Sequence, residues 1–214
     1  MPNSSTGQVA IKYGIQGPSL TITTACAASA NAIGEAKRMI EQNIVDKVLV
    51  GGTESGTTSM TIGAFAQIKA LSKQNDEPQK ACKPFDKNRD GFVMAEGSTV
   101  LIHESESSAK DRDAKIYGYI SGYGSSTDAY HITAPSEGGV GALRAMEQAI
   151  SNADISKENI DYINAHGTST PANDLNETLA IKSLMNDYAY EVNISSTKSM
   201  TGHLLGGGGA FEAM

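Results

Sequence analysis

Two kinds of segment alternate along the chain: short runs of β-branched and apolar residues, and longer stretches with helical periodicity. The short runs lie at residues 19–24, 46–50, 98–103, 115–124, 160–164 and 192–195. The longer stretches, in which apolar side chains recur every three or four residues, lie at 27–43, 140–152 and 174–186, with 2–13 as a further helix candidate. This alternation predicts an α/β protein with a largely buried sheet.

Cys26 lies at the point where the predicted strand 19–24 turns directly into the predicted helix 27–43. The first N–H groups of a helix are unpaired and carry partial positive charge, which favours the thiolate over the thiol. The small residues around Cys26 leave room for a substrate and for the close approach of other backbone. The alternative is that Cys26 is an inert thiol, packed as a small apolar residue.

Three more reactive residues, His166, Lys198 and His203, also come shortly after predicted strands. Functional sites of α/β proteins gather at the carboxyl ends of strands. A thiolate beside two histidines and a lysine fits a nucleophile whose neighbours can stabilise an oxyanion. The shared topology therefore favours a nucleophilic active site over four unrelated residues.

Each of these residues also has a structural alternative. His166 could bond to the backbone of its own turn, and Lys198 could be an ordinary surface lysine. Glu212 could pair with Lys198 or face solvent. Asp174 is a candidate helix N-cap, with Glu177 three residues later as its partner in a capping box.

Residues 86–97 open like a calcium-binding loop, but the twelfth position is Gly97 where the bidentate glutamate belongs. We therefore reject a calcium site there and expect Arg89 and Asp90 to form structural ion pairs. The glycine run 206–209 is not followed by the lysine and hydroxyl residue of a phosphate-binding loop.

Composition excludes several classes of function. The net charge of -7 over 214 residues argues against a surface for nucleic acid or anionic membrane. There is no apolar run long enough for a transmembrane helix, and residues 1–25 do not have the pattern of a signal peptide. The two cysteines, far apart, do not suggest a disulfide framework, so we expect a reducing, cytoplasmic setting.

Five motifs give the chain a specific resemblance, and together they span almost its whole length. They lie at residues 24–26, 84–92, 128–131, 166–171 and 196–203. In this order they resemble the beta-ketoacyl-acyl carrier protein synthases, the elongating condensing enzymes of bacterial fatty-acid synthesis. The resemblance implies a thiolase-like layered α/β fold, two similar halves and a homodimer.

The resemblance also implies that the chain is truncated at both ends. Residues 1–112 would be the C-terminal part of the first half, and 113–214 the N-terminal part of the second. The first strands would be missing, as would the later Gly-Phe-Gly loop that supplies a gating phenylalanine and an oxyanion-hole N–H. At residues 206–209 the family usually has Gly-Ala-Ala-Gly, so the four glycines here should weaken that helix by roughly 1 kcal/mol per replaced alanine.

Site roles follow from the same resemblance. Cys26 would carry the growing acyl chain as a thioester, while His166 and His203 hold the enolate formed when the malonyl group loses carbon dioxide. Lys198 would orient that site, held by Glu212 with Asp174 nearby. The expected substrate-binding residues are Phe65 at the acyl pocket, and Thr133, Thr168 and Thr170 along the phosphopantetheine channel, although the last two could merely cap their turn.

The implied reaction is a decarboxylative Claisen condensation that lengthens an acyl chain by two carbons. The implied partner is acyl carrier protein, loaded with acyl or malonyl groups. No metal and no organic cofactor is expected, because the phosphopantetheine arm belongs to the carrier. Neither acyl-length preference nor a choice between fatty-acid and polyketide pathways follows from the sequence, although the close match favours fatty acids.

Three other interpretations remain open. A thiolase or a chalcone-synthase-like enzyme would combine its cysteine with a different partner set, and the two histidines with Lys198 argue against both. A chain-length-factor-like partner would have lost the nucleophile, which Cys26 argues against. The last alternative is an inert truncated product.

Overall fold

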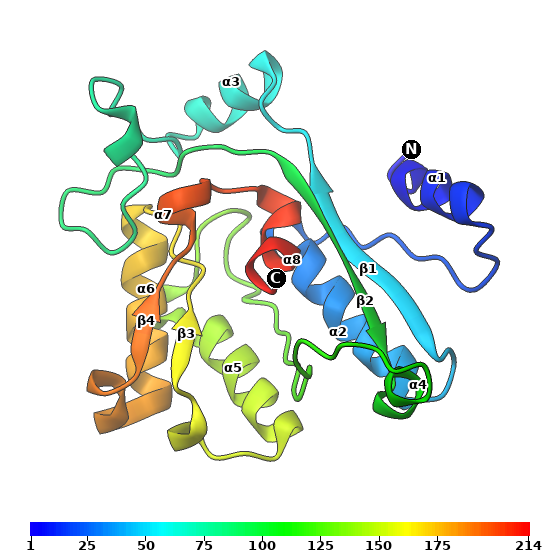
Figure 1. Cartoon of the computed structure of the whole chain (residues 1–214). Coiled ribbons are helices and arrows are strands. Elements are labelled where there is room, and N and C mark those ends of the chain that lie inside the picture. The colour runs from blue at the N-terminus through cyan, green and yellow to red at the C-terminus, as the bar shows by residue number, and fades with distance from the viewer. The chain divides into compact units, whose positions relative to one another are not determined.

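A computed structural model describes residues 1–214, and they form two compact units built from interleaved segments (Figure 1). The first unit consists of Met1–Glu54, Gly97–Gly118 and Leu205–Met214, and the second of Ser55–Glu96 and Tyr119–Leu204. This spatial grouping is a different division from the sequence-based one between residues 112 and 113, which stays a prediction.

The first unit is built on two long antiparallel strands and a helix that covers one of their faces. Its elements are α1 (Ser4–Tyr13), α2 (Ala28–Glu41), β1 (Lys47–Glu54), β2 (Gly97–Glu104), α4 (Glu106–Asp111) and α8 (Gly208–Glu212). Strand β1 pairs with β2 so that Val50 lies opposite Leu101. Helix α2 contributes Ile33 and Ala36 to a core that Val50 and Ala210 complete.

The opposite face of this two-stranded sheet is open, which corrects the expectation of a largely buried sheet. Leu49 and Ile102 are cross-strand partners on that face, and they are 40% and 63% exposed. Val100 is 60% exposed beside them. Because successive side chains of a strand point to opposite faces, α2 covers only the alternate residues.

Two predicted strands are wrong: residues 19–24 and 115–124 form no strand. Strand pairs occur only between β1 and β2 and between β3 and β4. Alternating side chains give a segment strand propensity, but a strand forms only when the segment's backbone groups pair with those of a neighbour.

The helix candidate at residues 2–13 is confirmed as α1, which ends at Gly14 in the left-handed conformation with φ 65°.

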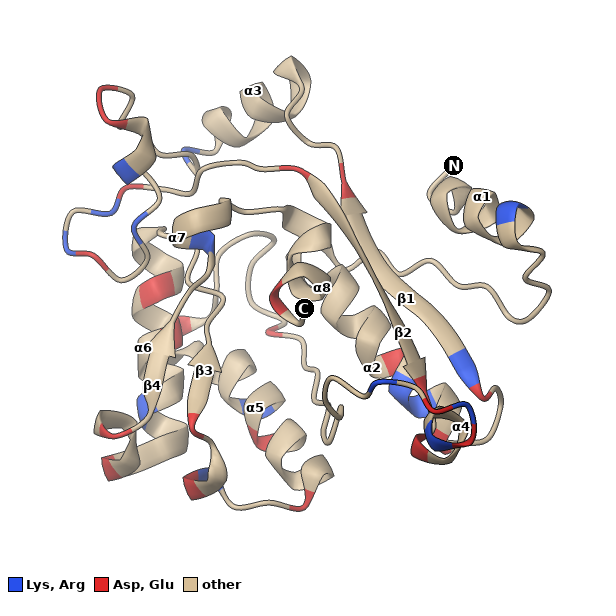
Figure 2. Ribbon diagram, in the orientation of Figure 1, with Lys and Arg blue, Asp and Glu red and all other residues tan.

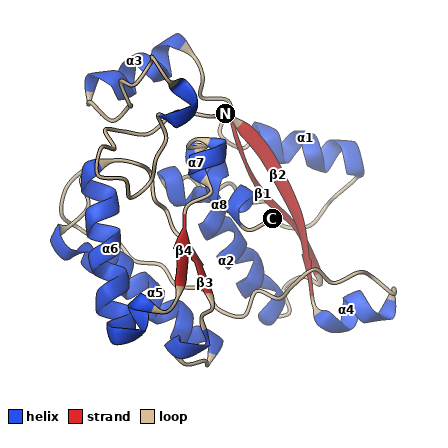
Figure 3. Cartoon of the chain, turned by 60° about the vertical axis from the view of Figure 1, so that its left-hand side comes forward, coloured by secondary structure: helices blue, strands red, loops and turns tan.

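The second unit contains a shorter sheet with helices beside it (Figure 3). Its elements are α3 (Ser59–Gln67), α5 (Val140–Ala153), β3 (Tyr162–Asn164), α6 (Pro171–Met185), β4 (Asn193–Ser195) and α7 (Lys198–Thr201). Strands β3 and β4 are parallel, with Ile163 opposite Ile194. Ala180, Ile181 and Met185 of α6 are buried.

Charged residues of both signs occur in each unit (Figure 2). None of the helices combines the length and the apolar character that crossing a bilayer requires.

The glycine run 206–209 provides a matched pair of stability tests within the first unit. A Cβ at Gly208 would meet nothing within 4 Å, whereas a Cβ at Gly209 would lie 2.7 Å from the backbone nitrogen of Ala30. We expect Gly208→Ala to raise the free energy of unfolding by about 0.5–1 kcal/mol, because alanine favours the helix and restricts the unfolded chain.

The control is Gly209→Ala, which we expect to destabilise the chain by about 1–3 kcal/mol through overpacking against α2. Urea unfolding of the two variants and the parent chain measures both differences. Equal effects at the two positions would contradict the close packing of α8 against α2.

Candidate active site

The predicted nucleophile, Cys26, lies in the first unit at the start of α2. Residues Ala25–Ala27 form a 3-10 turn that runs directly into the helix, and Ala25 takes a left-handed φ of 51° there. Cys26 is half-buried. The predicted junction with a helix is therefore confirmed, although an irregular segment rather than a strand leads into it. The N–H groups of Ala27 and Ala28 are bonded to the carbonyls of Thr24 and Ala25, and the helix dipole places partial positive charge at this end of α2.

Small residues brace this turn. The Ser29 hydroxyl, which is 2% exposed, accepts a hydrogen bond of 2.9 Å from the N–H of Ala210 in α8. A Cβ at Gly52 of β1 would lie 2.6 Å from the Ser29 Cβ and 2.9 Å from the Cα of Gly207. Glycine is therefore required where the three backbones meet, and this fixes the turn that carries Cys26.

His166 and His203 lie together in the second unit. Their ring centroids are 5.3 Å apart and the rings are nearly perpendicular, at 82°. His166 follows β3, whose pairing with β4 continues as Ala165 donates a 2.8 Å hydrogen bond to the Ser195 carbonyl. His203 is held through its backbone, donating 2.7 Å to the carbonyl of Val93.

Lys198 comes three residues after β4 and is 2% exposed. Because β3 and β4 are parallel, their carboxyl ends lie at the same edge and bring Lys198 and His166 into one region. The predicted positions of these residues after strands are confirmed, and a surface location for Lys198 is excluded.

Burial and the Lys198 ammonium keep both imidazoles neutral at pH 7. Burial, with smaller contributions from the positive charge of Lys198 and from the neighbouring His203, lowers the pKa of His166 to about 3. Burial also lowers the pKa of His203 to about 4, again with a contribution from Lys198. A neutral imidazole carries one N–H, so each ring can donate one hydrogen bond to an oxygen that becomes negative.

These lowered pKa values make folding pH dependent. In the unfolded chain both histidines become protonated near pH 6.5. In the folded chain they stay neutral until the pH falls to about 4 for His203 and about 3 for His166. We therefore expect full stability above pH 6.5 and a loss as pH falls below it, by roughly 1.4 kcal/mol per pH unit for each histidine.

Urea unfolding between pH 7 and 4.5 measures how the free energy of unfolding changes with pH. The variant His203→Gln removes one titrating group, so its free energy of unfolding should change less steeply with pH, by about the contribution of one histidine. A slope that does not change in the variant would contradict a buried, neutral His203.

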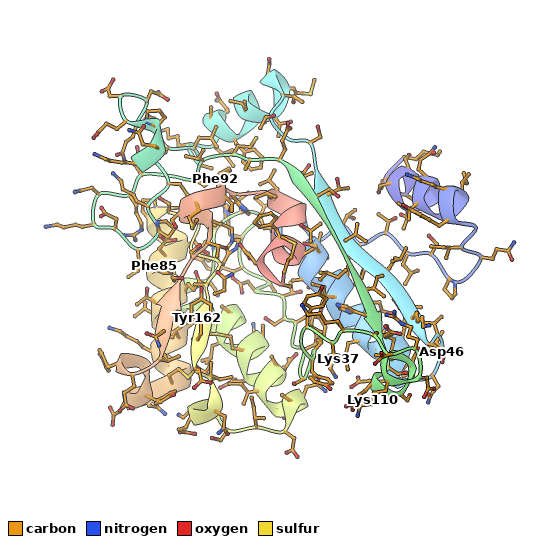
Figure 4. All side chains as sticks on the ribbon, in the orientation of Figure 1. Lys37, Asp46, Phe85, Phe92, Lys110 and Tyr162 are labelled. Atoms are coloured by element: carbon orange, nitrogen blue, oxygen red, sulfur yellow. The ribbon has the colours of Figure 1, made fainter.

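Asp174 joins two of the sequence motifs. Its carboxylate, 1% exposed, accepts hydrogen bonds from the N–H of Phe85 at 2.8 Å and of Ser169 at 3.2 Å. The Arg89 guanidinium lies 3.3 Å away, as the sequence led us to expect for a structural ion pair. Phe85, labelled in Figure 4, and Ser169 both have left-handed φ, at 64° and 68°.

The prediction that Asp174 caps its helix is wrong, because α6 begins three residues earlier, at Pro171, and Thr170 is its N-cap. Proline suits the first helical position, since its missing N–H would be unpaired there anyway. Asp90, for which an ion pair was also expected, instead accepts hydrogen bonds from Ser72, Lys73 and Gln74.

Glu177 has a role that the sequence did not reveal. Its carboxylate accepts hydrogen bonds from the N–H of His166 at 2.6 Å and of Gly167 at 2.7 Å. Burial raises the pKa of Glu177, and the nearby Asp174 carboxylate adds to this, while the two N–H donors oppose it. Residues three apart share a helix face, so the sequence places Glu177 on the face of Asp174, but it does not show that this face meets the loop of His166.

The predicted substrate-binding residues occupy varied positions. The hydroxyls of Thr168 and Thr170 lie 2.8 Å apart and bond to each other, and Thr168 is buried. Thr133 is exposed in the loop before α5, where its N–H donates to His131. Phe65 is on α3 in the second unit. Cys26 and Glu212 belong to the first unit, so the pairing of Glu212 with Lys198 stays a prediction.

The chain matches a known protein family over nearly its whole length. It belongs to the beta-ketoacyl synthase family: the model of the N-terminal domain matches residues 1–109 and that of the C-terminal domain matches residues 117–214. The chain is 51% identical over 212 residues to 3-oxoacyl-[acyl-carrier-protein] synthase 2 of Synechocystis, and 49% identical over 212 residues to the synthase 2 of Coxiella burnetii. These matches cover 99% of this chain and 51% of each relative. The chain therefore spans about half the length of the curated relatives it matches.

Solved structures give the same family and the same mixed α/β fold. A type II polyketide acyl carrier protein in complex with its ketosynthase matches with a TM-score of 0.96 and 40% identity, over 99% of this chain and 52% of that one. A beta-ketoacyl synthase from Burkholderia phymatum matches with a TM-score of 0.93 and 36% identity, over 100% of this chain and 51% of that one.

Proposed function

We propose that this chain carries the catalytic residues of a beta-ketoacyl-acyl carrier protein synthase that elongates fatty acids. The single observation that carries the proposal is the pair of neutral, perpendicular imidazoles of His166 and His203 beside the buried Lys198, in a member of this family. Two neutral N–H donors suit an oxygen that gains negative charge during the reaction.

In the first half-reaction, the Cys26 thiolate attacks the carbonyl carbon of an acyl thioester on the carrier. The carbonyl π bond reforms as the carrier's thiolate leaves, and the acyl group stays on Cys26. The start of α2 places partial positive charge near this thiolate, which favours the charged sulfur.

In the second half-reaction, the malonyl carboxylate leaves as carbon dioxide. The electron pair of the broken C–C bond passes to the α-carbon and is delocalised onto the thioester oxygen, where His166 and His203 donate hydrogen bonds. The α-carbon then attacks the carbonyl of the Cys26 thioester, and the cysteine leaves as thiolate. The product on the carrier is a β-ketoacyl chain two carbons longer.

The other predicted residues have supporting roles in this proposal. Lys198, with Glu212, sets the electrostatics around the histidines, and Asp174 holds the loops that precede α6. Thr133, Thr168 and Thr170 line the phosphopantetheine channel, and Phe65 borders the acyl pocket. The reaction uses no metal and no organic cofactor beyond the carrier's own arm.

The proposed partner is an acyl carrier protein. The names of the curated relatives include this carrier, and one solved relative is a ketosynthase in complex with one. We also propose a homodimer and a cytoplasmic location; Cys26 and Cys82 are not joined in a disulfide, which suits a reducing compartment.

Condensation can be tested with two proteins. One is this chain alone. The other is a full-length chimera in which the same 214 residues replace the matching half of the Synechocystis synthase 2, and it is called the full-length frame below. With acyl and ¹³C-malonyl carrier protein, we expect the full-length frame to release one carbon dioxide for each two-carbon extension.

Activity of the full-length frame alone would assign the function to these residues and show that they need the further segments that the relatives contain. A folded full-length frame that neither decarboxylates malonyl carrier protein nor extends an acyl chain would overturn the proposal. Binding of a catalytic synthase without any acyl adduct would instead indicate a chain-length-factor-like partner.

A further inference from the structure

Phe92 connects to the candidate histidine site but has no role in the chemistry above. It lies in the second unit, where Figure 4 labels it, and is 5% exposed. Its ring centroid is 5.1 Å from that of His203, and the two rings are nearly perpendicular, at 81°. His166 is a second neighbour of the His203 ring, at 5.3 Å and 82°. The His203 ring therefore has two aromatic rings in edge-to-face contact with it.

The backbone around Phe92 holds the same histidine. The Phe92 N–H donates to the Ala70 carbonyl and the Phe92 carbonyl accepts from Ser72, both at 3.0 Å, so the residue is fixed on both sides. The residues that follow it fix His203: Val93 accepts from the His203 N–H at 2.7 Å, and the Ala95 N–H donates to the His203 carbonyl at 3.0 Å.

An imidazole whose backbone is fixed can still rotate about its side-chain torsions, and this rotation aims its single N–H. The torsion next to an aromatic ring is broad, so packing rather than rotamer preference must select the angle. Edge-to-face contact with another ring is favoured only over a limited range of angles. A donor that stabilises developing charge must be held in place before the charge appears.

We propose that Phe92 is a positioning residue that fixes the imidazole of His203 in its donor orientation. This inference rests on the proposed function of His203 as an oxyanion donor. Phe92 does not touch the reacting atoms in this account, and it acts only through the histidine ring. The Phe92 ring also contacts the ring of Phe65, with centroids 5.3 Å apart, so α3 is anchored next to Phe92.

Three variants separate positioning from general packing. Phe92→Leu keeps an apolar side chain and removes the ring, whereas Phe92→Tyr keeps the ring. Met185→Ala, in α6 of the same unit, removes a side chain that is 2% exposed and is not among the ring contacts of either histidine. It serves as the control for a loss of stability without a change at His203.

The first readout is NMR of the imidazole nitrogens in this chain, which needs no catalysis. We expect the His203 titration midpoint to rise from about 4 toward 6.5 in Phe92→Leu as water reaches the ring, and to stay near the parent value in Phe92→Tyr and Met185→Ala. His166 and the Lys198 ammonium face the same ring and are unchanged in all three variants. An unaltered His203 midpoint in a folded Phe92→Leu would overturn the proposal.

The second readout is kinetic and uses the full-length frame. Phe92→Leu should slow malonyl decarboxylation by about 10- to 100-fold while acylation of Cys26 stays within about threefold, and Phe92→Tyr should recover most of the loss. If Phe92→Leu and Met185→Ala slow both steps equally, Phe92 is only a packing residue. If the parent frame has no activity but the NMR shift appears, the proposed function fails while the positioning of His203 stands.

Discussion

Replacement of Asp174 by alanine should lower the free energy of unfolding by about 3–5 kcal/mol, the largest effect on stability that we expect from one substitution. The carboxylate is 1% exposed, and its removal leaves the N–H groups of Phe85 and Ser169 without their acceptor. It also leaves the Arg89 guanidinium, itself largely buried, without the carboxylate at 3.3 Å. A buried group that loses its partner costs the full desolvation of what remains.

The control for this prediction is Asp90→Ala in the neighbouring motif. Asp90 accepts hydrogen bonds from side chains such as Ser72 and Gln74 near the surface, so its loss should cost about 1 kcal/mol or less. In the Asp174→Ala background, Arg89→Leu should restore part of the stability, because it removes the stranded charge. Urea midpoints of the parent chain, the two single variants and the double variant test this order of stabilities. Equal losses of stability for Asp174→Ala and Asp90→Ala would contradict it.

The largest expected effect on malonyl decarboxylation is at His203. We expect His203→Ala to slow malonyl decarboxylation by about 10²- to 10³-fold, because it removes one of two donors to the enolate oxygen. Acylation of Cys26 precedes decarboxylation in the proposed reaction and should change little. His203→Gln keeps an N–H donor on a flexible chain and should recover part of the rate.

The matched variant is Cys26→Ala, which should abolish acylation while the malonyl group can still lose carbon dioxide. Release of carbon dioxide and mass of the acylated protein, both measured in the full-length frame, separate the two steps. A His203→Ala protein that loses acylation and decarboxylation to the same extent would show that the histidine supports the fold rather than the enolate.

The sequence predicted elements where a local pattern and a partner coincide. Residues 46–50 and 98–103 became β1 and β2, because each supplies the pairing that the other needs. Residues 19–24 and 115–124 have the same alternation but no paired neighbour, and they form no strand. Strand propensity is local, whereas strand formation depends on residues far away in sequence.

The same distinction applies to the site. The order of β3, His166, β4 and Lys198 could be predicted, because parallel strands bring their carboxyl ends together. The use of Glu177 as acceptor for the backbone of His166 could not, because it depends on where α6 begins. The helix starts at a proline that the apolar periodicity alone does not mark, and this shift places Asp174 and Glu177 over the preceding loop.

Residues 206–209 are four glycines where the family usually has Gly-Ala-Ala-Gly. The space for an added side chain differs from one of these positions to the next. A side chain at Gly209 would collide with Ala30, so glycine is needed there. At Gly208 a Cβ would meet nothing, and at Gly207 its nearest contact would be 3.6 Å. The family's alanines would fit at these two positions, so this chain has a less rigid helix where close packing does not require it.

Peptide-mapped acylation of the two cysteines tests the central claim most directly, because this chain contains its own control. Burial raises the pKa of the Cys82 thiol, partly opposed by a hydrogen bond from Val93, so Cys82 should be a poor nucleophile. Cys26 lies at the start of α2, where a thiolate is favoured. With an acyl carrier thioester or cerulenin at pH 7, the account predicts at least about tenfold more adduct on Cys26 than on Cys82. Equal labelling of the two cysteines, or labelling of Cys82 alone, would contradict an activated nucleophile at Cys26.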